Sequence, residues 1–456
     1  MSARLSEATL AHAPADIVRP TYDRADLRAG IVHLGLGAFH RAHQAVFTED
    51  AIAVAGGDWG IAGVSLRHGA IRDALVPQDL LYAVEILGGP VRVIGALTAA
   101  LVAPEAPAAV TAVLTSPATH IVTLTITEAG YALTAAGELD FSHPDIAHDL
   151  AADIPRSAIG WLTHGLAERR RAGAGPVTVV ACDNLIGNGA RLEAAVSAFA
   201  QRLDPTLPAW IVANAAFPSS MVDCIVPAAD AAHRARVAAA LRLEDAASVQ
   251  REAFAQWAIE DRFAGPRPAW ERAGVEIVAS VADHERLKLH VLNAAHSALA
   301  YLGLARGLEF MREAIGDADL AVFADAMIAE EVAPVLPDVA VAPYWRGVRA
   351  RLANPRLDHR LCQIGEDGSA KLAQRIFPML IANARAGRPC ARLAEAVRAW
   401  LTAAGQGRVR DARSAVLTDW FRSGARPAEA LDDPRLFPDA FRAEPRVRAA
   451  MLQVAA

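Results

Sequence analysis

The stretch "AGIVHLGLGAF", residues 29–39, decides the fold of the first half of the chain. It is an apolar run that ends in Gly35 and Gly37, and it predicts a buried strand that enters a glycine turn. In a dinucleotide-binding turn the first glycine permits the tight turn, and the second lets the backbone approach a pyrophosphate at a helix N-terminus. The third glycine of the GxGxxG pattern would fall at His40. The turn alone therefore leaves open an ordinary strand-to-helix connection.

Four more apolar runs follow, and helix-length segments separate them. Buried strands that alternate with helices favour βαβ units and a mainly parallel sheet. From about residue 285 onward the sequence is rich in Ala and Leu with helical spacing. We therefore predict an α/β domain followed by a mostly helical domain, with the boundary near 280. The four runs are "WGIAGVSL" (59–66), "HIVTLTI" (120–126), "PVTVVACDN" (176–184) and "PAWIVANAAF" (208–217).

Composition limits the classes of function. With 53% hydrophobic and 21% charged residues among 456, the chain is globular in composition. A net charge of -6 argues against a nucleic-acid partner. The four cysteines form no close pair, which suggests reduced thiols in the cytoplasm and no Cys/His metal site. We see no signal peptide and no apolar run of about 18 residues without charge, so we expect no transmembrane helix.

Lysine is rare in this chain, and one of the two lysines lies in the stretch "DHERLKLHVLNAAH" (283–296). Burial can lower the pKa of a lysine until the amine acts as a base, whereas arginine keeps its proton. On an α-helix with Lys288 at 0°, Glu285 lies at about 60°, His296 at about 80° and Asn293 at about 140°. These four side chains would form one polar face. A surface Glu285–Lys288 ion pair with two ordinary polar residues remains the alternative.

Several longer motifs resemble one family. The motifs are "GLGAFHRAHQ" (35–44), "TLTITEAGY" (123–131), "CDNLIGNG" (182–189), "FPSSMVD" (217–223), "KLHVLNAAH" (288–296) and "DGSAK" (367–371). Together they resemble the polyol-specific long-chain dehydrogenases, which include mannitol 2-dehydrogenases, fructuronate reductases and arabinitol dehydrogenases. The resemblance implies a Rossmann-type dinucleotide-binding domain over 1–280 and a mostly helical substrate-binding domain over 281–456. It also implies a zinc-independent, NAD-dependent interconversion of a sugar alcohol and its ketose.

The resemblance also implies roles for particular residues. Lys288 is similar to the general base of the family, and Asn184 and Asn293 to the amides that hold the reacting oxygen. His296 would orient the substrate, and Glu285 would let the proton reach solvent. The residues implied to line the polyol site are Asp223 and Lys371. Those implied to contact the cofactor are Gly35, Leu36, Gly37, Ala38, Phe39, Arg67 and Thr127.

Two departures from the family pattern bear on specificity. Gln363 stands eight residues before Lys371, where an arginine is expected, and this favours a neutral polyol over a uronate. Arg67 and His68 follow the second strand where an acid would select NAD, so NADP stays open. We expect a monomer that converts mannitol to fructose, with arabinitol or sorbitol as other polyols. The alternatives are a fructuronate or tagaturonate reductase and a non-catalytic dinucleotide-binding sensor.

Overall fold

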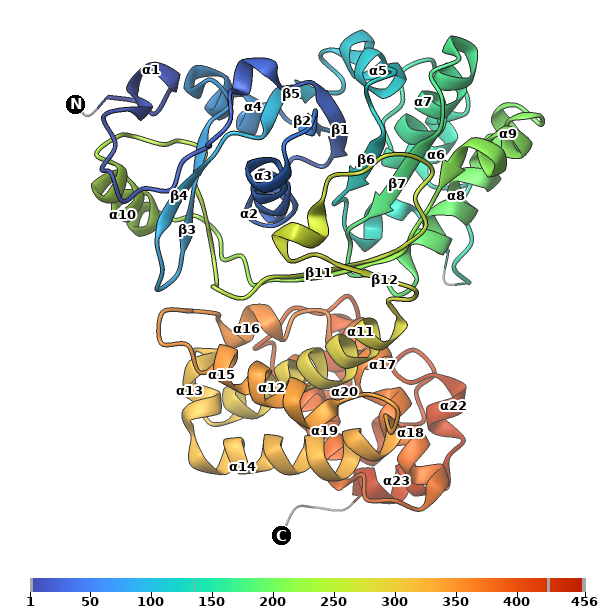
Figure 1. Cartoon of the computed structure of the whole chain (residues 1–456). Coiled ribbons are helices and arrows are strands. Elements are labelled where there is room, and N and C mark those ends of the chain that lie inside the picture. The colour runs from blue at the N-terminus through green and yellow to red at the C-terminus, as the bar shows by residue number, and fades with distance from the viewer. Residues whose placement is uncertain (1–2, 135, 425–426, 453–456) are drawn as a thin grey trace. The chain divides into compact units, whose positions relative to one another are not determined.

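The computed structural model describes residues 3–134, 136–424 and 427–452. The chain divides into two compact units, Met1–Ala282 and Asp283–Ala456. The first unit is built on β-sheets with helices, and the second is helical, as the element labels in Figure 1 show. This agrees with the fold class predicted from the sequence.

A parallel sheet is the centre of the first unit. Within the described residues it has six strands in the order β5-β2-β1-β6-β7-β8. In chain order of the parallel strands this is 3-2-1-4-5-6, the order of the dinucleotide-binding Rossmann fold. The strands are β1 (Ala29–Leu34), β2 (Gly60–Ser65), β5 (Leu97–Val102), β6 (Ile121–Leu124), β7 (Val177–Ala181) and β8 (Ala215–Ala216).

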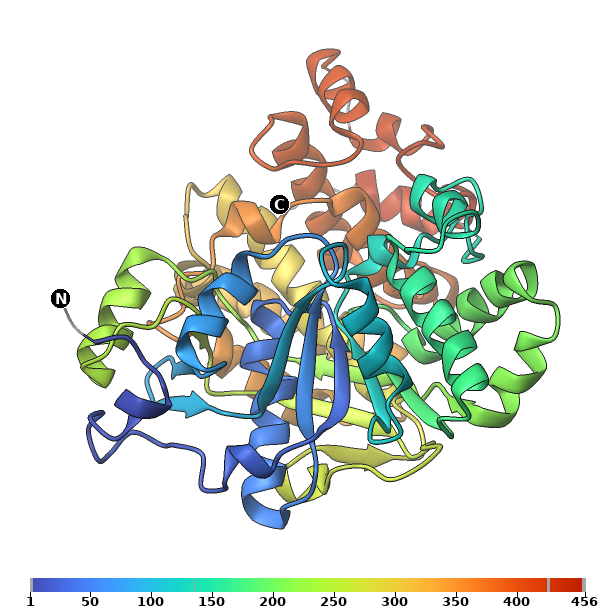
Figure 2. The ribbon, with the colours of Figure 1, turned by 90° about the horizontal axis from the view of Figure 1, so that it is seen from above.

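Helices cover both faces of this sheet, as Figure 2 shows. Alternate residues of β1 point to opposite faces, so Ile31 packs in one apolar cluster while Val32 and Leu34 pack in another. The cluster with Ile31 includes residues of α3, and the other includes residues of α5, α7 and α8. Burial on both faces explains why these strands read as continuous apolar runs. The four helices are α3 (Gln44–Ala55), α5 (Pro107–Thr115), α7 (Ala158–Ala172) and α8 (Asn188–Leu203).

Two smaller sheets complete the strands of the first unit. One has the order β10-β3-β4 and the other β12-β11-β9. Their strands are β3 (Tyr82–Ile86), β4 (Val91–Ile94), β9 (Ser220–Asp223), β10 (Val249–Arg251), β11 (Gln256–Glu260) and β12 (Glu276–Val278). The remaining α-helices are α1 (Glu7–Leu10), α2 (Ala38–Ala42), α4 (Ala70–Leu75), α6 (Pro144–Asp149), α9 (Leu207–Asn214) and α10 (Ala231–Leu241).

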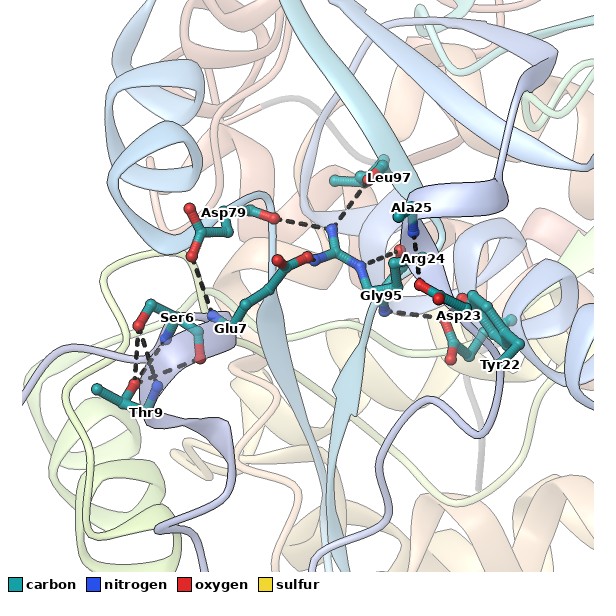
Figure 3. Close-up of polar contacts among 11 residues, drawn as sticks. Ser6, Glu7, Thr9, Tyr22, Asp23, Arg24, Ala25, Asp79, Gly95 and Leu97 are labelled. Atoms are coloured by element: carbon teal, nitrogen blue, oxygen red, sulfur yellow. Dashed lines mark hydrogen bonds and ion pairs between the residues drawn. The ribbon is translucent and has the colours of Figure 1, made fainter.

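Arg24 anchors the N-terminal segment to the edge of the sheet (Figure 3). Its guanidinium donates to the carbonyl oxygens of Gly95 at 2.9 Å and Asp79 at 2.7 Å. It also pairs with the carboxylate of Glu7, and it donates to the carbonyl of Leu97, the first residue of β5. One arginine therefore joins α1 to the edge strand by several bonds.

The described part of the second unit contains helices and no strand. At its centre α12 packs against α13, α14, α16, α17 and α19. The first half of the unit holds α11 (Ala282–Leu287), which begins at the junction, η5 (Lys288–Asn293), α12 (Ala294–Ala305), α13 (Met311–Gly316), α14 (Ala318–Ala326), η6 (Met327–Val332) and α15 (Val341–Leu352). The second half holds α16 (Leu361–Ile364), α17 (Gly368–Arg375), α18 (Phe377–Ala386), α19 (Ala391–Gly405), α20 (Ser414–Arg422), α21 (Pro427–Ala430), α22 (Asp439–Arg442) and α23 (Pro445–Leu452). Over the described ranges of both units, none of the helices combines the length and apolar character that crossing a membrane requires.

One predicted strand is wrong. The run at 208–217 forms α9 and only the last two residues before Phe217 form the short strand β8. Pro208 lies in the first turn, where the missing N–H costs nothing. Leu207 and Ile211, one helical turn apart, are the buried residues of α9, while Val212 is 73% exposed. The buried pattern is therefore helical, although the run of apolar letters resembles a strand.

Candidate active site

The glycine turn after β1 needs one glycine for its own geometry and has a second that lies open. Gly35 has φ +102°, and a Cβ added there would lie 2.3 Å from the carbonyl oxygen of Thr125. Gly37 has an ordinary φ of -97°, and an added Cβ would meet only the carbonyl oxygen of Gly35, at 3.6 Å. Gly35 therefore makes the tight turn possible, while the backbone at Gly37 is open to a close ligand. This arrangement fits a pyrophosphate.

The turn lies where the order of the sheet reverses. β1 pairs with β2 on one side and with β6 on the other, and all three strands are parallel. Ligands of open α/β sheets bind at this switch point, beyond the carboxyl ends of the strands. The segment after β6 contains Thr127, which is exposed and has φ +66°. The predicted cofactor contacts at Gly35 and Thr127 therefore lie on neighbouring loops.

Asp183 holds the loop after β6 to the loop after β7. Its carboxylate accepts the backbone N–H groups of Ile126 and Thr127, each at 2.8 Å, and the hydroxyl of Tyr131 at 3.0 Å. Burial raises the pKa of Asp183 to about 6, against the lowering effect of these bonds. Asn184, the predicted amide of the site, is the next residue and is exposed. The position of Asn184 thus depends on a buried carboxyl group beside it.

Asn188 connects the same loop to β9. Its amide donates to the carbonyl of Asp183 at 3.0 Å, and its oxygen accepts the N–H of Ser220 at 3.0 Å. Ser220 is the first residue of β9 and Asp223 is the last. Asp223 is 4% exposed and pairs in register with Gln256 of β11. The predicted substrate residue Asp223 is therefore on a strand that is tied to the Asn184 loop.

The remaining predicted cofactor residues differ in exposure. Arg67 follows β2, is exposed, and lies 3.6 Å from a carboxylate oxygen of Asp145. In the turn itself Leu36 is buried, Phe39 is half-buried and Ala38 is exposed. No acidic residue lies between the end of β2 and α4, so the sequence there, "LRHG", keeps its cationic character in the fold.

In the second unit, Lys288 and Asn293 are the first and last residues of a π-helix, η5. The predicted α-helical angles for residues 285–296 are therefore wrong, because a π-helix has i→i+5 hydrogen bonds and turns less per residue than an α-helix. Glu285 precedes this segment on α11, and His296 follows it on α12. Glu285, Lys288 and Asn293 are half-buried. Single π-helical turns occur frequently at functional sites.

His296 lies in a group of basic side chains. It is 9% exposed, and its ring meets that of His359 edge-on with centroids 5.0 Å apart. Burial lowers the pKa of His296 well below its usual range, and the charges of His359 and nearby cations, including Lys371, lower it further. Lys371 is half-buried and donates to the carbonyl of Ile364 at 3.3 Å. The structure thus gathers the predicted residues His296 and Lys371 with an unpredicted one, His359.

Three residues that shape these sites were missed. Asp183 and Asn188 lie within the motif "CDNLIGNG", in which only Asn184 was predicted to act in the site. Their value depends on contacts with β6 and β9, which the sequence does not reveal. His359 is distant in sequence from His296, and nothing in its surroundings marks it. Over the ranges that the structure describes, no three His, Cys, Asp or Glu side chains gather in a way that would hold a metal ion.

Comparisons with known proteins cover both units. The family model of the mannitol dehydrogenase Rossmann domain matches residues 29–272, and that of the mannitol dehydrogenase C-terminal domain matches 280–430. A mannitol 2-dehydrogenase of Phaeosphaeria nodorum is 40% identical over 84% of this chain and 70% of its own length. The D-mannonate oxidoreductase of Escherichia coli is 39% identical over 84% of this chain and 82% of its own length.

A solved structure has the same fold over almost the whole chain. It is the Pseudomonas fluorescens mannitol 2-dehydrogenase in a ternary complex with NAD and D-mannitol, with a TM-score of 0.88 and 33% identity. The match covers 98% of this chain and 95% of that one. The glycine turn, the strand order and these matches agree, and the chain belongs to the mannitol dehydrogenase family of oxidoreductases.

Proposed function

We propose that this protein oxidises a secondary alcohol of an open-chain sugar alcohol to the ketose with NAD, mannitol to fructose first, and that Lys288 is the base. The observation that carries the proposal is the place of Lys288 in its helix. It begins a π-helical turn that ends at Asn293, in a chain whose cations are otherwise arginine with one exception. Lys288 is half-buried, burial disfavours the charged form of an amine, and π-helical turns are frequent at functional sites.

The residues of the chain would act on the proton and the oxygen of the substrate. The amine of Lys288, when neutral, accepts the hydroxyl proton as the carbonyl forms. The amide N–H groups of Asn184 and Asn293 donate to the oxygen on which negative charge develops. Glu285 passes the proton from the lysine toward solvent. His296, Asp223 and Lys371 bind the hydroxyl groups of the substrate, and His296 is suited to this because burial keeps its imidazole neutral.

The glycine turn would hold the cofactor. Gly35 and Gly37 let the backbone approach its pyrophosphate, with Leu36, Ala38 and Phe39 in the same turn. Thr127 lies on the neighbouring loop, and Arg67 follows the strand whose end usually recognises the ribose. When bound, NAD supplies the acceptor for the hydride that leaves the alcohol carbon. The first unit thus serves the dinucleotide, and the second carries the base.

Exchanging Lys288 tests the role of the base. Lys288→Met should lower kcat by about 100-fold to 10,000-fold, the range for loss of a positioned general base. Lys288→Arg keeps the positive charge but cannot give up its proton, so it should be impaired to a similar extent. Thermal unfolding and NADH binding of both variants should stay close to wild type. Substantial turnover in either variant would refute the role of Lys288.

The substrate is tested by a panel of alcohols and keto sugars. We expect turnover of mannitol with fructose as the product, observed as NADH absorbance and unaffected by EDTA. The second candidate is a sugar acid, such as mannonate or fructuronate, which the 39% identity to the D-mannonate oxidoreductase favours. Gln363 in place of an expected arginine weighs against it. The ratio of kcat/KM for fructose and fructuronate, measured with NADH and with NADPH, decides between them.

A dinucleotide sensor without catalysis is the candidate from another class. It would bind NADH tightly and turn over none of the panel. The base and the two amides argue against it, because a sensor needs neither.

A further inference from the structure

His33 is a buried side chain of β1 that contacts both the glycine turn after β1 and the segment at the end of β6. It is 0% exposed. Its Nδ1 lies 2.7 Å from the hydroxyl of Thr123, the residue beside it in register on β6. Its Nε2 lies 3.0 Å from the carbonyl oxygen of Gly35 and 2.9 Å from the hydroxyl of Thr125. One imidazole therefore links β1, the loop after β6 and the first glycine of the turn.

The partners determine which nitrogen carries the proton. The carbonyl oxygen of Gly35 only accepts, so Nε2 must donate, and Nδ1 must accept the hydroxyl proton of Thr123. Burial lowers the pKa of His33 to about 3, so the ring stays neutral in this tautomer at physiological pH. Both nitrogens are satisfied, and the ring is fixed in one orientation.

The carbonyl of Gly35 is the common acceptor of the turn. Besides Nε2 of His33, it accepts the hydroxyl of Thr125 at 2.9 Å and the N–H of Gly37 at 2.6 Å. The N–H of Gly35 in turn donates to the carbonyl of Val64 on β2 at 2.8 Å. The turn is held on both sides before any ligand arrives, which lowers the entropy cost of binding.

His40 stacks on His33 from the helix that follows the turn. The ring centroids are 3.4 Å apart and the planes differ by 14°. His40 is 1% exposed, and neither of its ring nitrogens has a hydrogen-bond partner in the described part of the chain. Its contact with His33 is one of packing between the two rings. His40 occupies the place of the third glycine of GxGxxG, whose usual effect is to let the helix pack closely on the strand.

We infer that the stacked pair of His33 and His40 is a positioning device for the dinucleotide turn. His33 fixes the carbonyl of Gly35, and His40 sets the spacing between α2 and β1 that a glycine sets elsewhere. Both side chains are buried and would act through the turn. The inference rests on the proposed function, because it assumes that the turn binds a dinucleotide.

The test compares exchanges that keep or remove each feature, in the full chain. His33→Phe keeps a ring but removes the contacts with Gly35, Thr125 and Thr123. Only the bond to Gly35 acts on the turn directly, so NADH binding should weaken about tenfold, as expected for loss of one well-made hydrogen bond. His40→Phe keeps the stack and should bind NADH within about twofold of wild type, because a phenyl ring retains the packing on His33. His40→Ala removes the stack and should bind several-fold more weakly. The KM for NAD should rise in step, while kcat changes by less than about threefold.

A buried histidine elsewhere in the first unit supplies the control. His233 is also 0% exposed, and its nitrogens contact Glu85 at 2.7 Å and Ser248 at 3.1 Å, beside the sheet of β3, β4 and β10. His233→Phe should lower thermal stability but leave the Kd for NADH unchanged. If His33→Phe folds poorly, Thr123→Val removes one of its partners with little change in shape, and it should weaken NADH binding less than the His33 exchange.

The outcomes separate the two proposals. If wild type binds NADH and the His33 and Thr123 variants bind it as tightly as the His233 control does, the positioning role is refuted and the proposed function stands. If His40→Phe is as weak as His40→Ala, the nitrogens matter and the packing role is refuted. If wild type binds neither NADH nor NADPH, the proposed function fails and the inference fails with it.

Discussion

Gly37→Ala separates stability from cofactor binding. The protein alone has room for this methyl group, because the nearest atom to the added Cβ is the carbonyl oxygen of Gly35 at 3.6 Å, an ordinary contact. The φ of -97° is also available to alanine. Gly37 is the N-cap of α2, where alanine costs up to about 1 kcal/mol relative to glycine. The reduced entropy of the unfolded chain offsets about 0.4–1 kcal/mol of that cost.

The expected effect on stability is therefore within about 1 kcal/mol, or a few degrees in Tm at most. Binding should respond differently. If a pyrophosphate lies against the backbone at Gly37, the methyl group displaces it and weakens one or two charge-assisted hydrogen bonds of about 1.5–3 kcal/mol each. That corresponds to a rise of about 10-fold to 100-fold or more in the Kd for NADH.

The assay is a titration of NADH by protein fluorescence, with thermal unfolding of the same samples. Gly265→Ala is the matched control, because an added Cβ there meets nothing within 4 Å and its φ is not positive. Both variants should unfold near the temperature of wild type, and only Gly37→Ala should lose affinity. An unchanged Kd in Gly37→Ala would refute the assignment of this turn to the pyrophosphate.

Three further predictions follow from the same geometry. In thermal unfolding assays Gly35→Ala should destabilise the protein more than Gly56→Ala. Both glycines have positive φ, which costs an alanine about 1–2 kcal/mol, but only at Gly35 would the added Cβ meet a backbone atom, at 2.3 Å. The pKa of Asp183 rises from 3.8 to about 6 on folding, so its contribution to stability is present below pH 3.8 and is lost as pH rises through 6. In denaturant unfolding, the free energy of unfolding of wild type should fall by up to about 3 kcal/mol relative to Asp183→Asn as the pH rises through that window. Gly368→Ala should cost about 1–3 kcal/mol by overpacking, because the added Cβ would lie 2.3 Å from Nε1 of Trp400, and thermal unfolding measures this.

Four of the six strands described in the central sheet were predictable because they are buried on both faces. β1, β2, β6 and β7 are continuous apolar runs bounded by turn residues, and each was predicted within a few residues of its observed position. The edge strand β5 of the central sheet was not identified, nor were β3, β4, β9, β10, β11 and β12. β5 lies at the edge of the central sheet and mixes buried with half-buried residues, and the other six strands belong to the three-stranded sheets.

The Lys288 segment shows a different limit. Its helical character was predictable from the spacing of apolar residues, and η5 and α12 bear this out. The π-helical turn was not, because it changes one set of backbone hydrogen bonds without changing the residue types that favour a helix. A wheel drawn at a constant angle therefore misplaces every residue after Lys288 relative to those before it.

The incomplete glycine fingerprint has a physical explanation in the fold. A sequence pattern records glycine where close packing of helix on strand is achieved by having no side chain. Here His40 stands at that position, and a flat ring at 3.4 Å from the ring of His33 provides another form of close packing. The pattern therefore fails for this chain at its third position, where a stacked ring stands in place of a glycine. Since His33 lies two residues before Gly35, the two histidines must be considered together before the turn is dismissed as a weak match.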